Sequence, residues 1–329
     1  MPSGASEPRT AGAECAMVAY IVKRVLSGVI LLFVVSGLTF VLTNLAAGDV
    51  ASQILGMQAT QAQVDAKNIE LGLNEPLLLR YLDWLRAALT GDLGTSWFTS
   101  ESVSGAILTR IPVTLSVVIL VMTVTTVASF GIGIIAAVKR GHVDRVLQFL
   151  TVIGNAVPGF LVGLVLVTLF AIQLGWFPAT GYVPLTEDPA GWLWALILPV
   201  FALSIETTAG TAQQVRSAVI ATLRQDFVRT LRSRGIPERR VLLRHVLRNA
   251  SASPLTVLSL QFVSLLSGAV VIESVFALPG LGQLAVTYTS RGDIPVVMGL
   301  VVYTVAIVVI VNLLVDIAVG ALNPKARVS

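Results

Sequence analysis

Long runs without charged residues constrain the fold of this chain more than any other feature. A helix needs about 20 apolar residues to cross roughly 30 Å of hydrocarbon, and no backbone group can stay unpaired in lipid. Six runs are long enough, although the fourth contains Glu206 and the third leaves room for a loop. They cover 25–48, 111–138, 146–186, 189–215, 249–272 and 294–315. We therefore predict an all-α membrane protein with six transmembrane helices.

The composition argues against other classes of protein. Of the 329 residues, 55% are hydrophobic and 12% are charged, whereas about 25% are charged in an average soluble domain. A soluble enzyme and a disordered chain are therefore disfavoured. The single cysteine, Cys15, allows no disulfide within the chain, and His142 and His245 are too far apart for a zinc motif. We expect no cofactor, metal or nucleic acid to bind this chain.

The distribution of Lys and Arg sets the orientation. Six spans put both termini on one side of the membrane. With the termini in the cytoplasm, most of the 22 Lys and Arg residues lie on the inner side, including all nine arginines of 216–248. Because inner loops carry an excess of these residues, we predict that both termini are cytoplasmic.

The spans divide the chain into four parts. Residues 1–17 are small and polar and are expected to form a disordered cytoplasmic tail. The first transmembrane helix, 18–46, is too long for the core of a signal peptide and lacks a clear cleavage site, so we expect it to be retained. An extracytoplasmic loop follows over 47–110. The remaining residues, 111–329, form a five-helix core that contains an inner loop at 216–250.

The outer segment 47–110 is too long for a plain connector. Pro76 marks the start of a helix and Gly91 its end, which predicts an amphipathic helix over 75–90 on the membrane face or over the outer mouth of the bundle. A docking surface or gate explains this helix as well as a spacer without a partner does. The candidate docking or gate residues are Leu78, Tyr81, Leu82, Trp84 and Leu85.

The inner segment 216–248 combines many arginines with a helix break. Gly235 ends one short helical run and Pro237 opens a second. Arginines then repeat every four residues, at positions 240, 244 and 248. Charge alone is equally compatible with an anchor for anionic lipids and with a docking site for a soluble partner. The helix–turn–helix favours docking, since a lipid anchor does not need one.

Three carboxylates, Glu206, Glu273 and Asp316, lie in or near the apolar runs. Carboxylates at membrane depth are costly and often mark a transport path. Glu206 lies deepest, and path lining and helix pairing explain it equally well. Glu273 and Asp316 lie near span ends, where capping or pairing is commoner. The candidate pathway residues are Glu206 and Glu273.

Several separated motifs resemble a known family over residues 18–327. They are Tyr20-Ile21-Val22-Lys23-Arg24, Ala47-Gly48-Asp49, Leu71-Gly72-Leu73-Asn74-Glu75-Pro76, Gly91-Asp92-Leu93-Gly94-Thr95-Ser96, Arg229-Thr230-Leu231-Arg232-Ser233-Arg234-Gly235, Leu278-Pro279-Gly280-Leu281-Gly282 and Asp293-Ile294-Pro295. With these motifs in this order, the chain resembles the first of the two permease subunits of dipeptide, oligopeptide and nickel importers of the ATP-binding-cassette (ABC) class. The resemblance implies a type I ABC importer fold.

The resemblance also implies a set of partners. Such a permease pairs with a homologous second permease, two cytoplasmic ATP-binding subunits and an extracytoplasmic substrate-binding protein. This chain has no Gly-x4-Gly-Lys-[Ser/Thr] motif, so ATP and Mg²⁺ are expected in the partner ATPases. The chain itself is expected to be a permease subunit rather than an enzyme, placed in the cell membrane of a prokaryote.

The family's cytoplasmic loop supplies a coupling helix that seats on the ATPase. Carried over to this sequence, Leu231 stands where the family usually has Ala. The implied ATPase-coupling residues are Arg229, Thr230, Leu231, Arg232, Arg234, Gly235, Ile236, Pro237, Arg239 and Arg240.

The function expected from all of this is that of a pore subunit for ATP-driven uptake of peptides. An importer of the same type that carries nickel or haem is an alternative, because relatives divide among these cargoes. A secondary carrier or channel that works without ATP is the rival from another class. It would work with no ATPase bound and would give Gly235 no role.

Overall fold

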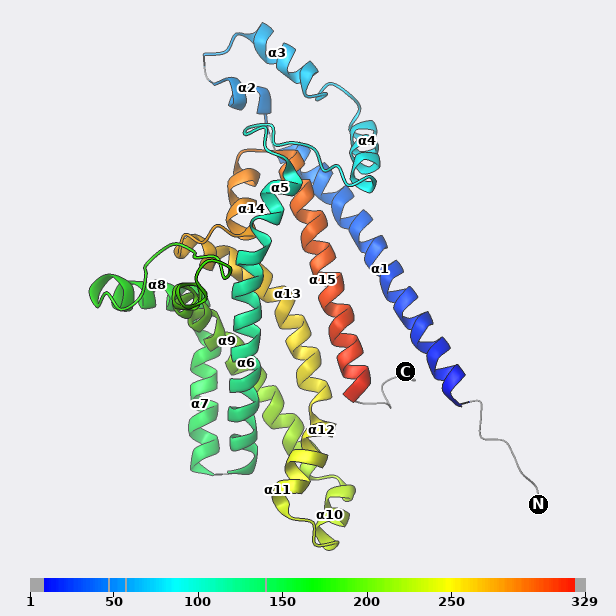
Figure 1. Ribbon diagram of the computed structural model, residues 1–329, viewed down its shortest axis with the longest axis vertical. Helices are drawn as coiled ribbons and strands as arrows, with labels where there is room; N and C mark the ends of the chain where they lie inside the picture. The colour runs from blue at the N-terminus through cyan, green and yellow to red at the C-terminus, as the bar shows by residue number, and fades with distance from the viewer. Residues whose placement is uncertain (1–8, 47, 57, 140, 323–329) are drawn as a thin grey trace, which may run out of the picture.

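The computed structural model describes residues 9–46, 48–56, 58–139 and 141–322, and Figure 1 shows an elongated molecule made of helices. Within these ranges there is no strand, and five helices are long and apolar enough to span a membrane. They are α1 (Arg9–Ala46), α6 (Ile111–Val138), α9 (Pro189–Leu223), α13 (Ala252–Val275) and α15 (Ile294–Leu322). A bent helix pair counts as a sixth span if it is taken as one. The prediction of an all-α membrane protein is confirmed.

The bent pair stands where a span with room for a loop was expected in 146–186. α7 (His142–Ala156) is followed by α8 (Gly159–Leu166), which continues as the π-helix η1 (Val167–Gln173), and the two halves meet at 90°. Pro158 disfavours a helical residue before it, and Val157 is extended, with φ −98° and ψ 115°. α8 therefore lies across the long axis of the molecule, whereas α7 runs along it (Figure 1).

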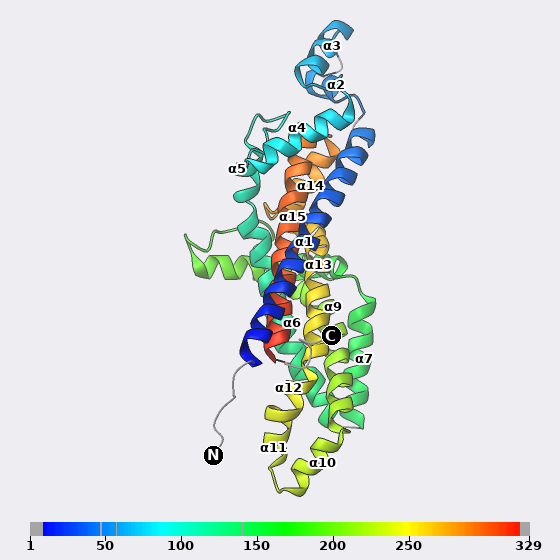
Figure 2. The same cartoon turned by 90° about the vertical axis from the view of Figure 1, so that its right-hand side faces the viewer.

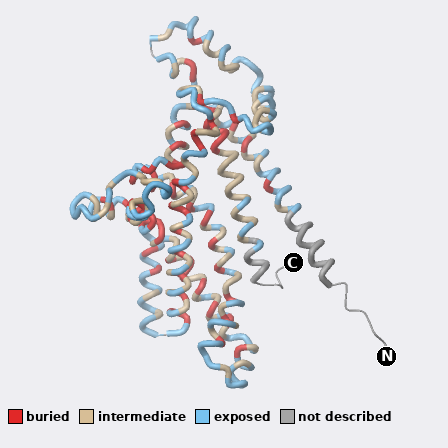
Figure 3. The backbone as a smooth tube through the Cα atoms, viewed as in Figure 1, coloured by how far each residue is buried: buried red, intermediate tan, exposed pale blue. Residues whose placement is uncertain are grey.

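The helix α9 is the centre of the helical core. The Asp188 side chain caps its start by accepting a hydrogen bond of 3.0 Å from the amide of Ala190. α6, α7, α8 and α13 all pack against α9. The core between them is built from Val, Leu, Ile, Ala and Phe, for example Val117, Leu196 and Ile272, which are fully buried. In Figure 3 buried residues concentrate in this region and where it meets α14 (Leu281–Ser290).

Glycines let the helices approach one another closely. A Cβ atom on Gly133 of α6 would lie 2.7 Å from Cβ of Val215 and 2.8 Å from the carbonyl oxygen of Ala212, both in α9. A Cβ atom on Gly154 of α7 would lie 3.0 Å from Cβ of Ala209. Small residues at such contacts suit helix packing in membranes.

The outer segment forms four short helices at one end of the molecule. They are α2 (Val50–Leu55), α3 (Gln61–Glu70), α4 (Leu77–Leu89) and α5 (Val103–Leu108). α4 is the helix expected over 75–90. The segment is tied to the core by Ser96, whose hydroxyl donates a hydrogen bond of 2.6 Å to the carboxylate of Asp293, just before α15. Burial raises the pKa of the Asp293 carboxyl above its usual value, and the bond from Ser96 opposes this effect.

The opposite end of the molecule carries the inner loop. Figures 1 and 2 show α10 (Asp226–Ser233) and α11 (Glu238–Arg240) at the end furthest from α2 and α3. The Arg9 end of α1 and the Leu322 end of α15 point towards that same end. α1 begins at Arg9, so the structure differs from the expectation of a disordered tail over 1–17; residues 1–8 lie outside the described residues.

We predict that Gly133→Ala lowers the temperature at which the detergent-solubilised protein unfolds. The new methyl group has to displace Val215 or the α9 backbone, and such overpacking costs about 1–3 kcal/mol. Gly131→Ala is the matched control in the same helix, because nothing lies within 4 Å of its Cβ position. The measurement is the loss of the monodisperse peak in size-exclusion chromatography after heating. Equal unfolding temperatures for Gly133→Ala and wild type would contradict the close packing of α6 on α9.

Candidate functional site

The turn after α10 has the geometry of a Schellman motif, in which a left-handed glycine ends a helix. Gly235 has φ +72°. Its amide donates to the carbonyl of Arg232 at 2.9 Å, and the amide of Ile236 donates to the carbonyl of Leu231 at 3.3 Å. This pair of bonds satisfies the last carbonyls of α10 and reverses the chain. Pro237 then opens α11 with φ −58°.

A salt bridge closes the same turn from the side. The Nε atom of Arg232 donates to Oε2 of Glu238 at 3.0 Å, and its second nitrogen pairs with Oε1. Such two-point contacts fix geometry as well as charge. The Arg232 guanidinium holds the pKa of the Glu238 carboxyl below its usual value. We call residues 226–240, which this turn folds into one unit, the coupling tip.

The coupling tip sits on the inner end of α9 through an apolar underside. Val228 is fully buried together with Val241, and both lie in a cluster with Val215 and Val219 of α9. Leu231 and Ile236 pack partly buried against the same cluster. Leu231, the position where the family usually has Ala, therefore faces this chain's own core.

The solvent-exposed surface of the coupling tip is polar and basic. Of the ten predicted coupling residues, Leu231 and Ile236 are half-buried, and the other eight are exposed. Those eight are Arg229, Thr230, Arg232, Arg234, Gly235, Pro237, Arg239 and Arg240. The exposed surface of the tip is thus a preformed turn that carries several guanidinium groups.

The helix that follows the coupling tip contains a π-helical segment. It runs through η2 (Val241–Val246) and α12 (Leu247–Ala250) into α13. The wider π-helical turn holds about one more residue than an α-helical turn, and residues four apart stay close to one face. Arg240, Arg244 and Arg248 are accordingly all exposed.

The structure gives Glu273 the capping and pairing role that its place near a span end favoured, rather than the pathway role for which it was also a candidate. Its side chain is 0% exposed. It accepts a hydrogen bond of 2.6 Å from the Thr114 hydroxyl, one of 2.8 Å from the amide of Gly282 and one of 3.1 Å from the amide of Gln283. Glu273 thus caps the start of α14 and joins it to α6. A path-lining role does not fit this burial, and sequence reasoning missed Thr114, since nothing in the chain order pairs residues this far apart.

Glu206 lies in a different environment. It is exposed near the middle of α9, and its Oε2 atom accepts a long hydrogen bond of 3.3 Å from the amide of Gly159, the first residue of α8. The two candidate pathway residues are therefore not brought together into one site. The side chain of Asp316 lies outside the described residues. Among the described residues, no three His, Cys, Asp or Glu side chains gather as a metal site would require.

The outer helix α4 separates the candidate docking or gate residues into two groups. Tyr81 and Trp84 face inward: the Tyr81 hydroxyl lies 2.9 Å from that of Ser36 in α1, and the rings of Tyr81 and Trp84 stack. Leu78 and Leu82 are exposed, at 67% and 37%. Leu85 is half-buried. Two of these residues thus fix α4 on the core, whereas the leucines leave an apolar surface outside.

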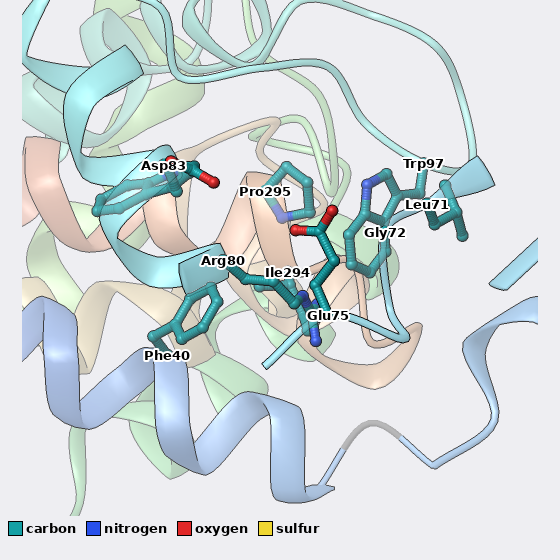
Figure 4. A pocket seen from close by; sticks show the side chains of 10 residues that line it. Phe40, Leu71, Gly72, Glu75, Arg80, Asp83, Trp97, Ile294 and Pro295 are labelled. Carbon is teal, nitrogen blue, oxygen red and sulfur yellow. The ribbon is translucent and has the colours of Figure 1, made fainter. Parts of the chain in front are cut away.

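A pocket of about 200 Å³ opens beside α4 at the outer end (Figure 4). Its wall contains Phe40 of α1, Glu75 and Arg80 around the start of α4, and Trp97. The Arg80 guanidinium carbon lies 5.8 Å from the centre of the Phe40 ring. Burial lowers the pKa of Arg80, and the nearby charge of Glu75 opposes that shift. The pocket therefore combines aromatic walls with charges of both signs.

We predict that Glu273→Ala destabilises the protein more than Glu273→Gln does. Alanine leaves two buried amides and a hydroxyl without an acceptor, at about 1–3 kcal/mol for each unsatisfied group, whereas glutamine keeps one acceptor oxygen. Thermal unfolding in detergent gives the order of stability, and transport per folded molecule gives the role. If Glu273→Gln abolished transport at unchanged stability, Glu273 would belong to a path after all.

Comparison with known proteins places this architecture in a family. Residues 129–328 match the family model described as "Binding-protein-dependent transport system inner membrane component", and residues 17–118 match the model of the N-terminal part of such membrane components. The first of these covers more than half of the chain.

Individual relatives agree over nearly the whole length. The chain is 39% identical over 312 residues to a protein of Brucella abortus (strain 2308), provisionally named a peptide transport system permease; the match covers 94% of this chain and 99% of the relative. It is 35% identical over 314 residues to the oligopeptide transport system permease protein AppB of Bacillus subtilis, with the same coverage.

A solved structure shares the fold. It is the MetNI methionine ABC transporter in inward-facing conformations, with a TM-score of 0.55 and 15% identity over 67% of this chain and 97% of the other. The predicted type I ABC importer fold is confirmed at the level of architecture. On the family match and these identities, the chain belongs to the family of binding-protein-dependent transport system inner membrane components.

Proposed function

We propose that this chain forms one half of the membrane pore of an ATP-driven importer of peptides. A homologous second permease would form the other half, and two cytoplasmic ATP-binding subunits would hydrolyse ATP with Mg²⁺. An extracytoplasmic binding protein would deliver the peptide. The names of the relatives support the peptide cargo, since AppB is named for oligopeptides and a 35% identical protein of Pseudomonas aeruginosa, DppB, for di- and tripeptides.

The observation that carries the proposal is the coupling tip. It projects from the end of the molecule furthest from the outer helices, and its fold is closed by Gly235 and by the Arg232–Glu238 pair (Figure 2). A surface of this kind suits docking of a soluble partner, because its shape is set before the partner binds. We assign this end, and with it both chain termini, to the cytoplasm of a prokaryote.

The proposed cycle moves the spans by way of the coupling tip. ATP binding closes the ATPase dimer and brings the two coupling tips of the permease pair together. The helices that rest on the tips then rock from an inward-open to an outward-open arrangement, as in other rigid-body transitions. The exposed leucines of α4 and the pocket beside them are assigned to contact with the binding protein at the outer face.

The first experiment is purification of the tagged chain from its native membrane in mild detergent, with mass spectrometry of the proteins that accompany it. Recovery of a homologous membrane protein and ATPase subunits in stoichiometric amounts is the expected result. The reconstituted complex then takes up labelled di- or oligopeptides when ATP is present. Uptake of nickel or haem in place of peptide would change the cargo but keep the importer. Transport by this chain alone, without ATP, would overturn the proposal in favour of a secondary carrier.

We predict that Glu238→Arg strongly reduces ATP-driven uptake, because it replaces the Arg232–Glu238 attraction with a repulsion and opens the turn. The double variant Arg232→Glu/Glu238→Arg carries the same charges as wild type in exchanged places and restores the pair, so it recovers much of the uptake. The amount of each variant in the membrane and its recovery with the ATPase are measured in parallel. A double variant as inactive as Glu238→Arg would show that the positions of the charges towards the partner matter, rather than the closed turn.

A further inference from the structure

The exposed surface of the spans is not uniformly apolar. From Val29 to Leu42, every exposed side chain of α1 is apolar, as expected for a helix that faces lipid. A second surface, on α7, α9 and α13, is different. It carries exposed or half-buried polar and small residues near the middle of α9 and α13 and at the end of α7. They are Asn155, Glu206, Gly210, Gln261, Ser264 and Ser267, which we call the polar strip.

Contacts between the helices place these residues side by side. A Cβ atom on Gly210 would lie 3.4 Å from Oδ1 of Asn155 in α7 and 3.5 Å from Nε2 of Gln261 in α13. Glu206 lies one turn from Gly210 on the same face of α9. It contacts the start of α8 through the amide of Gly159. Asn155, Gly210 and Gln261 therefore lie side by side on three helices, with Glu206 one helical turn away.

Ser264 lies at the level of Glu206. On α13, Gln261 bonds to the α9 residues Thr207 and Thr211. Further along α13, the Cβ position of Gly268 lies 3.7 Å from the side chain of Leu203 in α9. Since Ser264 stands between these two contacts, it is level with the part of α9 between Leu203 and Thr207. The serine extends the polar strip beside the carboxylate.

Some side chains of the polar strip are held by hydrogen bonds within the chain, and others are free to bind a ligand. The amide of Gln261 is used on both sides, because its Nε2 donates to the Thr207 carbonyl at 3.2 Å and its Oε1 accepts from the Thr211 hydroxyl at 2.8 Å. Oε1 of Glu206 and the side chain of Asn155 have no hydrogen-bond partner in the part of the chain that the structure describes. The free groups are thus the Oε1 acceptor of Glu206 and the amide of Asn155, whose Oδ1 accepts and whose Nδ2 donates, and the fixed amide of Gln261 holds α13 against α9.

The charge of Glu206 has no counter-ion on the neighbouring helices. Neither Lys nor Arg occurs between Arg145 and Arg216, nor between Arg248 and Arg291. These stretches include α7 from residue 146 onwards, all of α8, most of α9 and all of α13. A carboxylate at membrane depth needs a cation or a water-filled path to offset its cost. The helices around Glu206 supply no cation, so a water-filled path or a cation from outside the chain has to offset this cost.

We propose that the polar strip lines the route of the substrate and that Glu206 binds the protonated amino terminus of a peptide as it passes. This inference rests on the proposed function. An ammonium group donates three hydrogen bonds and carries the charge that Glu206 lacks, and Asn155 offers a further acceptor beside it. The path thereby recognises a group that every unmodified peptide carries, whatever its side chains.

The first test compares Glu206→Gln with Glu206→Asp in the reconstituted importer. Glutamine removes the charge at nearly constant shape and is expected to reduce peptide uptake about tenfold, as for the loss of a hydrogen bond to a charged group. ATP hydrolysis and recovery of the complex stay at the wild-type level. Aspartate keeps the charge and retains most of the uptake. Equal uptake by wild type and Glu206→Gln would overturn the inference.

A second test asks whether uptake needs a negative charge at position 206 and whether this position is accessible to water. Glu206→Cys is made in a Cys15→Ser background, since Cys15 is the chain's only cysteine. A negatively charged methanethiosulfonate reagent is expected to restore uptake, whereas a trimethylammonium reagent of similar size is not. Val34→Cys on α1, 60% exposed among apolar neighbours, is the control and is expected to resist both water-soluble reagents.

The outcomes separate the two claims. If Glu206→Cys reacts with neither reagent, position 206 faces lipid or is paired with a partner subunit. If both reagents have the same effect on uptake, the charge has no role. Either result overturns the inference. If the wild-type complex shows no ATP-driven peptide uptake, the proposed function itself fails. Normal wild-type uptake together with insensitive Glu206 variants leaves the proposed function intact and removes only the ammonium site.

Discussion

The outer end of the helical core depends on one buried carboxylate. Glu273 binds two amides at the start of α14 and the hydroxyl of Thr114, so one side chain joins α13, α14 and α6. The backbone has to come very close for this. A Cβ atom on Gly282 would lie 2.5 Å from Cα of Val270, and one on Gly280 would overlap the carboxylate. The two glycines let the backbone amides reach the Glu273 carboxylate, and these hydrogen bonds offset the cost of burying it.

Charge-free runs predicted the spans well, because hydrocarbon excludes both charge and unpaired backbone. They did not predict the right angle between α7 and α8. The run 146–186 contains no charged residue, and hydropathy alone does not distinguish a helix that crosses the membrane from one that turns at Pro158. Helix ends were also missed where a helix leaves the membrane, since α9 continues past the apolar run to Leu223.

The coupling tip could be expected from its motif and from the break at Gly235, yet its salt bridge could not. Arg232 and Glu238 are six residues apart, which is not a helical spacing, and only the turn between them brings the side chains together. The sequence distinguished Glu206 from Glu273 only by depth, because each is a carboxylate in or near an apolar run. Burial separates them, and the burial of Glu273 depends on Thr114, 159 residues away along the chain.

The continuity of α9 has a mechanical consequence. One helix carries Glu206 at its middle and, at its inner end, the valines on which the coupling tip rests. From Glu206 to Leu223 the helix rises roughly 26 Å at 1.5 Å per residue. A rod of this length moves as a whole, so a shift of the tip carries the carboxylate with it and needs no relay of side chains. Under the proposed function, the contact of the tip with an ATPase and the contact of Glu206 with a peptide would therefore change together.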